Sequence, residues 1–119
     1  MTKEDKELLI KDLSARMPYA VKVKLGDNPN IFDLEYRIKF AVMYGDSDKL
    51  EDILDITNIK PYLFPMSSMT WEQECQYREI IASSLNHYEV YDWLNKNHFD
   101  YRGIIEKGLA LDATGKNIY

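Results

Sequence analysis

Four side chains that can carry acid–base or ionic chemistry lie close together in the stretch NHFDYRG (97–103): His98, Asp100, Tyr101 and Arg102. A histidine exchanges protons near neutral pH, and a neighbouring carboxylate can orient its ring. The chain has no G-x-S-x-G elbow or other recognisable nucleophile to complete such a site. The sequence therefore favours the alternative interpretation, in which these groups cap a helix and hydrogen-bond a turn. An enzyme around His98 and Asp100 is the less favoured hypothesis, and we predict no catalytic residue.

Metal and nucleotide sites are not predicted either. His87 and His98 are eleven residues apart, without the short-spaced second ligand typical of zinc sites. Four aspartates crowd the segment 46–55, but their spacing is not that of an EF-hand loop. The five glycines are isolated, so no glycine-rich phosphate loop is present. We expect no cofactor and no metal.

The composition is that of an ordinary globular protein. The chain has 119 residues, 45% of them apolar and 29% charged, which predicts one domain with its own core. Its net charge of −5 argues against nonspecific nucleic-acid binding. The single Cys75 excludes an internal disulfide. We see no signal peptide and no apolar run long enough to span a bilayer, so we expect a cytoplasmic protein without membrane association.

The first half of the chain predicts a helix followed by strands. Thr2 and Asp5 resemble a capping box for a helix that ends near Pro18. Apolar and polar residues then alternate in the ranges 20–25 and 32–44, which predicts a long antiparallel hairpin over about 20–44. Ile53, Leu54 and Ile56 favour a short third strand over a helical turn. An unpaired edge of strand 32–44 would allow a homodimer.

The second half predicts helices. Capping boxes at Thr70–Gln73 and Asn86–Glu89 each open one helix, and Asp100 predicts a third, short helix that ends at Gly108. The fold class expected is therefore α+β, with an N-terminal helix, a small antiparallel sheet of two or three strands, and two or three C-terminal helices. The domain 1–119 would comprise a helix-plus-hairpin part (1–58), a buried connector (59–70) and a helical part (71–119).

The stretch IKPYLFPMSSMT (59–70) combines two prolines with many apolar side chains. Prolines fix the direction of a connector and remove donors that a loop would otherwise have to satisfy. We interpret it as a connector whose apolar side chains fill the space between the sheet and the helices. The alternative is a binding surface.

Three stretches carry a family resemblance: TKEDKELLIKDLSARMPYAVKVK (2–24), IKPYLFPMSSMT (59–70) and YDWLNKNHFDYRGIIEKGLALDA (91–113). They resemble a family of small uncharacterised proteins from gut bacteria and their mobile elements. The region 26–58 is where such proteins differ most. The family has no assigned activity, so the resemblance implies membership and carries no catalytic residue over to this chain.

The favoured function is a small non-enzymatic accessory or protein-interaction domain, possibly encoded on a mobile element. Aromatic richness and the absence of catalytic motifs support it. The expected partner is a protein, and the candidate interaction surface comprises Tyr62, Phe64, Met66, Trp93, His98 and Tyr101. The alternative is a nucleic-acid-associated regulator that uses a basic sheet face formed by Lys22, Lys24, Arg37 and Lys39.

Overall fold

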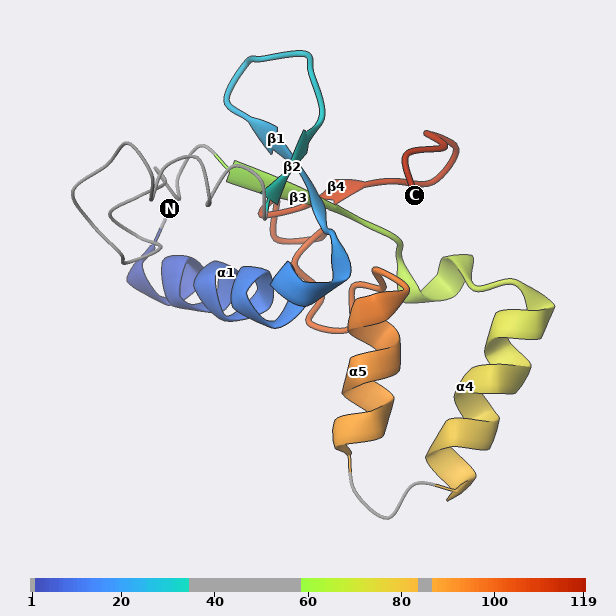
Figure 1. Cartoon of the computed structure of the whole chain (residues 1–119). Helices are drawn as coiled ribbons and strands as arrows, with labels where there is room; N and C mark the ends of the chain where they lie inside the picture. Colours follow the sequence, from blue (N-terminus) through green and yellow to red (C-terminus); the bar gives the residue numbers. More distant parts are fainter. Residues whose placement is uncertain (1, 35–58, 84–86) are drawn as a thin grey trace.

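The chain adopts an α+β fold in which helices lie to one side of a small sheet (Figure 1). The structure is a computed structural model, and it describes residues 2–34, 59–83 and 87–119. In this part of the chain the elements are, in order, α1 (Lys3–Arg16), η1 (Met17–Tyr19), β1 (Lys22–Leu25), β2 (Phe32–Asp33), β3 (Ile59–Leu63), η3 (Met66–Ser68), α4 (Trp71–Ser83), α5 (Tyr88–Lys96) and β4 (Leu111–Asp112). The expected fold class is confirmed.

Helix α1 begins as the sequence predicts. The Asp5 N–H donates to Thr2 Oγ1 at 3.0 Å, and the Thr2 N–H donates to Asp5 Oδ2 at 3.5 Å, which satisfies backbone donors that a helix start leaves free. Leu9 and Leu13 are completely buried on one face of the helix. They join residues of β1, β3 and the 104–110 segment in one hydrophobic core, so α1 is held mainly by that apolar face.

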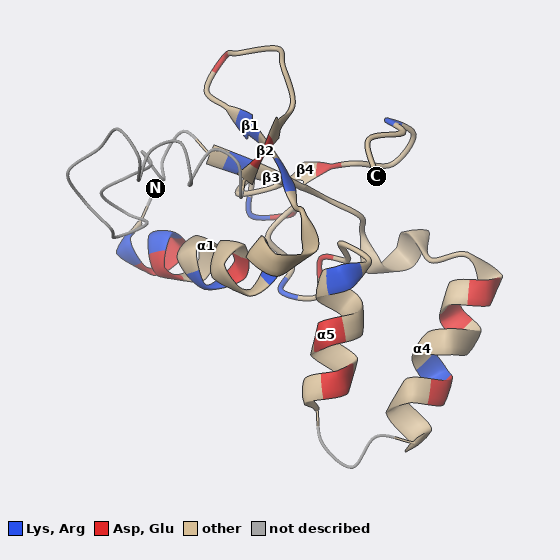
Figure 2. Cartoon of the chain, viewed as in Figure 1, with Lys and Arg blue, Asp and Glu red and all other residues tan. Residues whose placement is uncertain are grey.

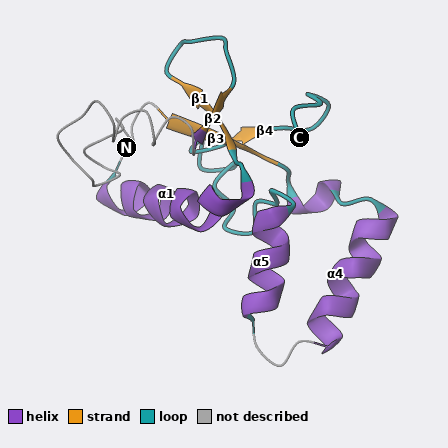
Figure 3. Cartoon of the chain, in the orientation of Figure 1, coloured by secondary structure: helices purple, strands orange, loops and turns teal. Residues whose placement is uncertain are grey.

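The sheet has the strand order β2-β1-β3-β4 (Figure 3). Strand β1 runs antiparallel to both β2 and β3, whereas β4 runs parallel to β3. The predicted pairing of 20–25 with the start of 32–44 is confirmed, with Val23 opposite Phe32. The expectation of a purely antiparallel sheet is wrong, because β4 adds a parallel edge.

The long strand predicted over 32–44 does not continue past Asp33 in the described part of the chain. Leu34 is already helical, although its N–H still donates to the Val21 carbonyl at 3.1 Å. It is completely buried in the core with Leu9 and Leu13. Alternation marks which side chains need burial, whereas tertiary contacts select the backbone conformation. Residues 35–44 and the proposed strand at 53–56 lie outside the described residues.

The segment 59–70 is buried in its first half, but it is more than a connector. Ile59–Leu63 forms β3, which lies between β1 and β4. The Leu63 carbonyl accepts a hydrogen bond from the Ala113 N–H, on the β4 side of β3. Backbone groups two residues apart in a strand point to the same side, so the nitrogen of Pro61 also faces the β4 side. Strand β4 starts only opposite Tyr62. The proline is tolerated because no acceptor of β4 lies opposite its missing N–H.

The C-terminal part contains two of the predicted helices. The Thr70–Gln73 capping box opens α4, with Thr70 N–H to Gln73 Oε1 at 2.9 Å and Gln73 N–H to Thr70 Oγ1 at 3.2 Å. The third helix is not formed: residues 104–108 make turns. None of the helices in the described ranges has the length and apolarity that crossing a bilayer requires.

The hydroxyl of Tyr119 completes the sheet where β1 and β3 separate. It accepts a hydrogen bond from the Lys22 N–H at 2.7 Å and donates one to the Tyr62 carbonyl at 2.8 Å. The direct β1–β3 register ends one step earlier, at Val23 and Pro61. A side-chain hydroxyl thus replaces one backbone hydrogen bond of the ladder, and its burial raises the pKa of Tyr119 well above the usual range.

Replacing Tyr119 by Phe tests this role. Tyr119→Phe keeps the ring but leaves the Lys22 N–H and the Tyr62 carbonyl without this partner. Because these hydrogen bonds lie at exposed or half-buried positions, we expect the free energy of unfolding, measured by urea denaturation, to drop by about 0.5–1.5 kcal/mol. Tyr91→Phe, which keeps an exposed ring of α5, is the control. Equal stabilities of the two variants would contradict the bridging role.

Candidate functional site

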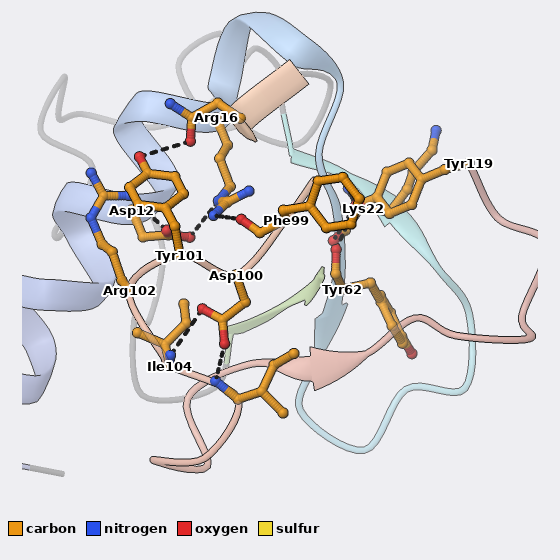
Figure 4. Close-up of polar contacts among 12 residues, drawn as sticks. Asp12, Arg16, Lys22, Tyr62, Phe99, Asp100, Tyr101, Arg102, Ile104 and Tyr119 are labelled. Atoms are coloured by element: carbon orange, nitrogen blue, oxygen red, sulfur yellow. Dashed lines mark hydrogen bonds and ion pairs between the residues drawn. The ribbon is translucent and has the colours of Figure 1, made fainter. Parts of the chain in front are cut away.

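The NHFDYRG stretch supports a turn and does not assemble the acid–base pair considered from the sequence. Both oxygens of Asp100 accept backbone N–H groups, from Ile104 and Ile105, each at 2.9 Å (Figure 4). The favoured interpretation of Asp100 as a backbone cap is thereby confirmed, although it caps a turn and not a helix. Its carboxylate is used to hold the 104–105 backbone, and it does not orient His98.

A buried ionic cluster lies beside this turn. Asp12 accepts from Arg16 Nε at 2.9 Å and from Arg102 Nη1 at 2.8 Å, while Arg16 Nη2 donates to the Phe99 carbonyl at 2.6 Å. Both Asp12 and Arg16 are completely buried. The ring of Tyr101 lies against both guanidinium groups, 5.3 Å from Arg16 and 4.6 Å from Arg102. Figure 4 shows this cluster joining α1 to the 99–102 segment.

His98 is buried and stacked. Its backbone has a left-handed φ of 62°, and its ring lies on the ring of Tyr119 with centroids 3.6 Å apart. Its Nδ1 has no hydrogen-bond partner within the described ranges. Burial, followed by the charges of Arg16 and Lys22, lowers the pKa of His98 from 6.5 to about 4. The imidazole is therefore neutral at pH 7.

The candidate interaction residues occupy two environments. Tyr62 and His98 are buried, whereas Phe64, Met66, Trp93 and Tyr101 are half-buried. Several of these rings belong to one aromatic series that runs from α4 into the body of the molecule. Tyr77 stacks on Trp93 at 5.8 Å, Trp93 on Phe99 at 5.7 Å, and Phe99 contacts Phe64 at 6.2 Å.

The most exposed rings lie elsewhere, on the α4–α5 hairpin. Trp71 and Tyr88 are each 78% exposed. Ile81 and Tyr91 are 49% and 47% exposed, and the free thiol of Cys75 is exposed as well. We call the outward sides of α4 and α5 that carry these residues the hairpin surface. The sequence predicts Trp71, Cys75 and Ile81 as members of a helix, but it gave no sign that they face outward.

Helix α4 contributes no buried residue to the fold. Its three half-buried residues, Gln73, Tyr77 and Ile80, are three or four positions apart and so lie on one side of the helix. In Figure 1 α4 stands outermost, with α5 between it and α1. Its opposite side, with Trp71 and Cys75, is covered by no described part of this chain.

The hairpin surface is acidic. Helices α4 and α5 carry five acidic side chains and two basic ones (Figure 2): Glu72, Glu74, Glu79, Glu89 and Asp92 against Arg78 and Lys96. The net charge of the two helices is thus −3. Arg78 is itself 3.8 Å from Glu74 in an exposed pair. This charge disfavours nucleic acid and favours a positively charged protein surface.

The basic sheet face is described in part. Lys22 pairs with Asp33 at 3.4 Å, and Lys24 lies directly opposite Lys60 of β3, a residue that the sequence alone did not place there. Arg37 and Lys39 lie outside the described residues. Within the described ranges, no group of three His, Cys, Asp or Glu side chains could hold a metal ion.

Comparison with known proteins gave no match to a family model, to a curated protein or to a solved structure. The family resemblance of the three sequence stretches remains a prediction, and the function must be argued from the molecule itself.

The burial of His98 predicts an acid-sensitive fold. Between pH 6.5 and about 4 the unfolded chain binds a proton at this position and the folded chain does not, so stability falls as the pH is lowered. At about 1.4 kcal/mol for each pKa unit, the loss is at most about 3.5 kcal/mol. His98→Asn, which tolerates a left-handed backbone, should lose less stability over this range in urea denaturation.

Carboxylates also titrate at acidic pH, so the comparison needs a second histidine variant. His87 is exposed at the start of α5, and His87→Asn should retain the pH dependence of the unmodified protein. If His98→Asn and His87→Asn lose stability equally on acidification, the assignment to His98 is wrong.

Proposed function

We propose that this chain is a non-enzymatic protein-interaction domain that docks a partner protein on the hairpin surface. The observation that carries the proposal is helix α4: it has 13 residues, none of them buried, and its outward side holds Trp71 and Cys75. Isolated helices of this length are marginal in water, and packing of an apolar face supplies most of the stability of helices in proteins. In this protein, a partner bound to the outward side of α4 would supply that packing.

The exposed side chains are of the type that dominates binding energy. Tryptophan and tyrosine are enriched among interface residues whose truncation costs most. Complete burial of one large apolar side chain stabilises by about 1.5–3 kcal/mol, and Trp71 and Ile81 both have surface left to bury. Single exposed apolar residues need no explanation, but several on two adjacent helices indicate an interaction site.

The side chains that suggested an enzyme make contacts that hold the fold together. Asp100 holds two backbone N–H groups, Arg102 pairs with Asp12, and His98 is buried under Tyr119. This use of the NHFDYRG side chains supports the non-enzymatic proposal. An accessory role, an origin on a mobile element and a cytoplasmic location are part of the same proposal and rest on the sequence. A homodimer through strand 32–44 also stays a proposal.

Two outward substitutions test the docking surface. The double variant Trp71→Ala/Ile81→Glu changes exposed side chains, so its thermal unfolding should match that of the unmodified protein. We expect it to lose partner capture at least tenfold, because truncation of one central aromatic contact costs about 2 kcal/mol or more. The measurement is affinity capture from lysate of the source cells with quantitative mass spectrometry, after nuclease treatment.

Ile31→Glu is the matched control, since Ile31 is 42% exposed but lies in the turn between β1 and β2. It should capture the same partner as the unmodified protein. The proposal fails if the double variant captures everything that the unmodified protein captures.

A second candidate function, nucleic-acid association, rests on the sheet face. Two ammonium groups on directly opposed residues, Lys24 and Lys60, repel each other, and a phosphate between them would relieve the repulsion. We expect Lys24→Glu to abolish any binding of a fluorescent oligothymidylate at low salt, measured by anisotropy. Lys11→Glu, at an exposed position of α1, should not. Absence of binding by the unmodified protein at low salt would end this candidate.

A further inference from the structure

A small notch opens at the base of α4, where η3, the start of α4, the 97–103 stretch and the C-terminal loop meet. Its cavity volume is about 230 Å³. The rings of Phe64 and Phe99 form the apolar part of its lining, and Ser68, Thr70, Gln73 and Thr114 form the polar part. Pockets for small-molecule ligands usually measure about 300–1,000 Å³, so this notch is better matched to a single side chain.

The polar groups of the notch are already paired within the protein. Thr70 and Gln73 form the reciprocal capping box, and the Ser68 hydroxyl donates to the Pro65 carbonyl at 2.6 Å. A ligand is therefore not required to satisfy them. Phe64 is half-buried and is the main ring available to a ligand, whereas Phe99 is 1% exposed and already stacked on Trp93; another aromatic ring makes the best use of such contacts. The lining selects a ring over a strongly polar group.

The surroundings of the notch are acidic. Glu72 and Glu74 flank Gln73 on α4 and are exposed. Asp112 accepts the Thr114 N–H at 2.8 Å. Lys116, whose ammonium lies over the ring of Tyr62, 6.0 Å from the centroid, interacts electrostatically with Asp112, so the negative charge near the notch comes mainly from Glu72 and Glu74. An aromatic ring that enters the notch is thus best carried by a positively charged chain.

We infer that the notch is an anchor pocket at the base of α4, beside the hairpin surface and not part of it, and that it receives one aromatic side chain from a basic segment of the partner protein. The inference rests on the proposed interaction function and specifies the chemistry of the partner. Trp71, next to Thr70 in the sequence and 78% exposed, belongs to the outward side of the same helix, so a partner that reaches both places would insert one ring into the notch and cover another. Interfaces concentrate their affinity in such paired anchors.

Three small probes with the same phenol ring and different charges test the inference: tyramine (positive), p-cresol (neutral) and 3-(4-hydroxyphenyl)propionate (negative). Each is titrated into the full-length protein while backbone amide shifts are recorded by NMR. We expect weak, saturable binding with shifts at Ser68, Gln73 and Thr114. Tyramine should bind about threefold more tightly than the propionate at low salt, the size of effect that exposed charges give.

Two variants separate the ring contact from the charge. Thr114→Phe, at an exposed position, fills the notch and should abolish the shifts caused by all three probes, whereas Lys107→Phe, on the exposed 104–108 turn, should not. Glu72→Gln/Glu74→Gln should leave p-cresol binding unchanged and remove the preference for tyramine. Thermal unfolding of each variant confirms that it is folded.

Several results would overturn the inference. One is the absence of notch shifts with any probe, and another is shifts that persist in Thr114→Phe. Equal or tighter binding of the propionate would exclude a basic partner. A dimer of the unmodified protein that dissociates in Thr114→Phe would assign the notch to a second copy of this chain. If Trp71→Ala/Ile81→Glu loses partner capture while Thr114→Phe keeps it, the interaction function stands and the anchor pocket fails.

Discussion

The carboxylate of Asp12 holds two guanidinium groups inside the protein, and the arrangement of the fold depends on this contact. Charges taken out of water are costly unless they are paired and hydrogen-bonded. Arg16 meets this requirement at Nε through Asp12 on its own helix and at Nη2 through the Phe99 carbonyl, 83 residues away in the sequence, whereas its Nη1 has no partner within the described residues. Helix α1 can bury its end only when the 99–102 segment is in place. The cluster therefore fixes which parts of the chain must meet, whatever its net contribution to stability.

A series of aromatic ring contacts connects this cluster to α4. Phe99, whose carbonyl binds Arg16, stacks with Trp93, and Trp93 stacks with Tyr77 of α4. Helix α4 is thus attached on one side, through contacts with α5 that end on the buried cluster. Its outward side stays open to a partner, because no described residue of this chain covers Trp71 or Cys75.

The sequence predicts the local elements well because their signals are local. The Thr2 and Thr70 capping boxes form as expected, since all their atoms lie within one helical turn. The sequence missed β3 and β4 for the opposite reason. Pro61 indicates a loop until the position of β4 is known, and Leu111–Asp112 is a strand only because β3 lies beside it. Such pairing is information that no short window contains.

The sequence did not reveal the hairpin surface, because this also depends on how distant parts of the chain pack. Apolar residues at helical spacing indicate a helix with faces to cover, but they do not tell whether this chain or another one covers them. Only the position of α4 in the structure shows that Trp71, Cys75 and Ile81 face outward. Asp100 was interpreted correctly as a backbone cap, because a carboxylate that precedes a turn has an immediate local use for its oxygens, but the helix expected after it is a turn.

The Tyr119 hydroxyl also has a consequence for the order in which the molecule forms. It joins backbone groups of Lys22 and Tyr62, which are 97 and 57 residues away in the sequence. Contacts between such distant residues require closure of long loops and slow the folding of a domain. A ribosome that has released the chain only as far as α5 has exposed β1 and β3 without this hydroxyl. The sheet is then completed after synthesis of the C-terminal loop, and until then its two central strands are open to wrong partners.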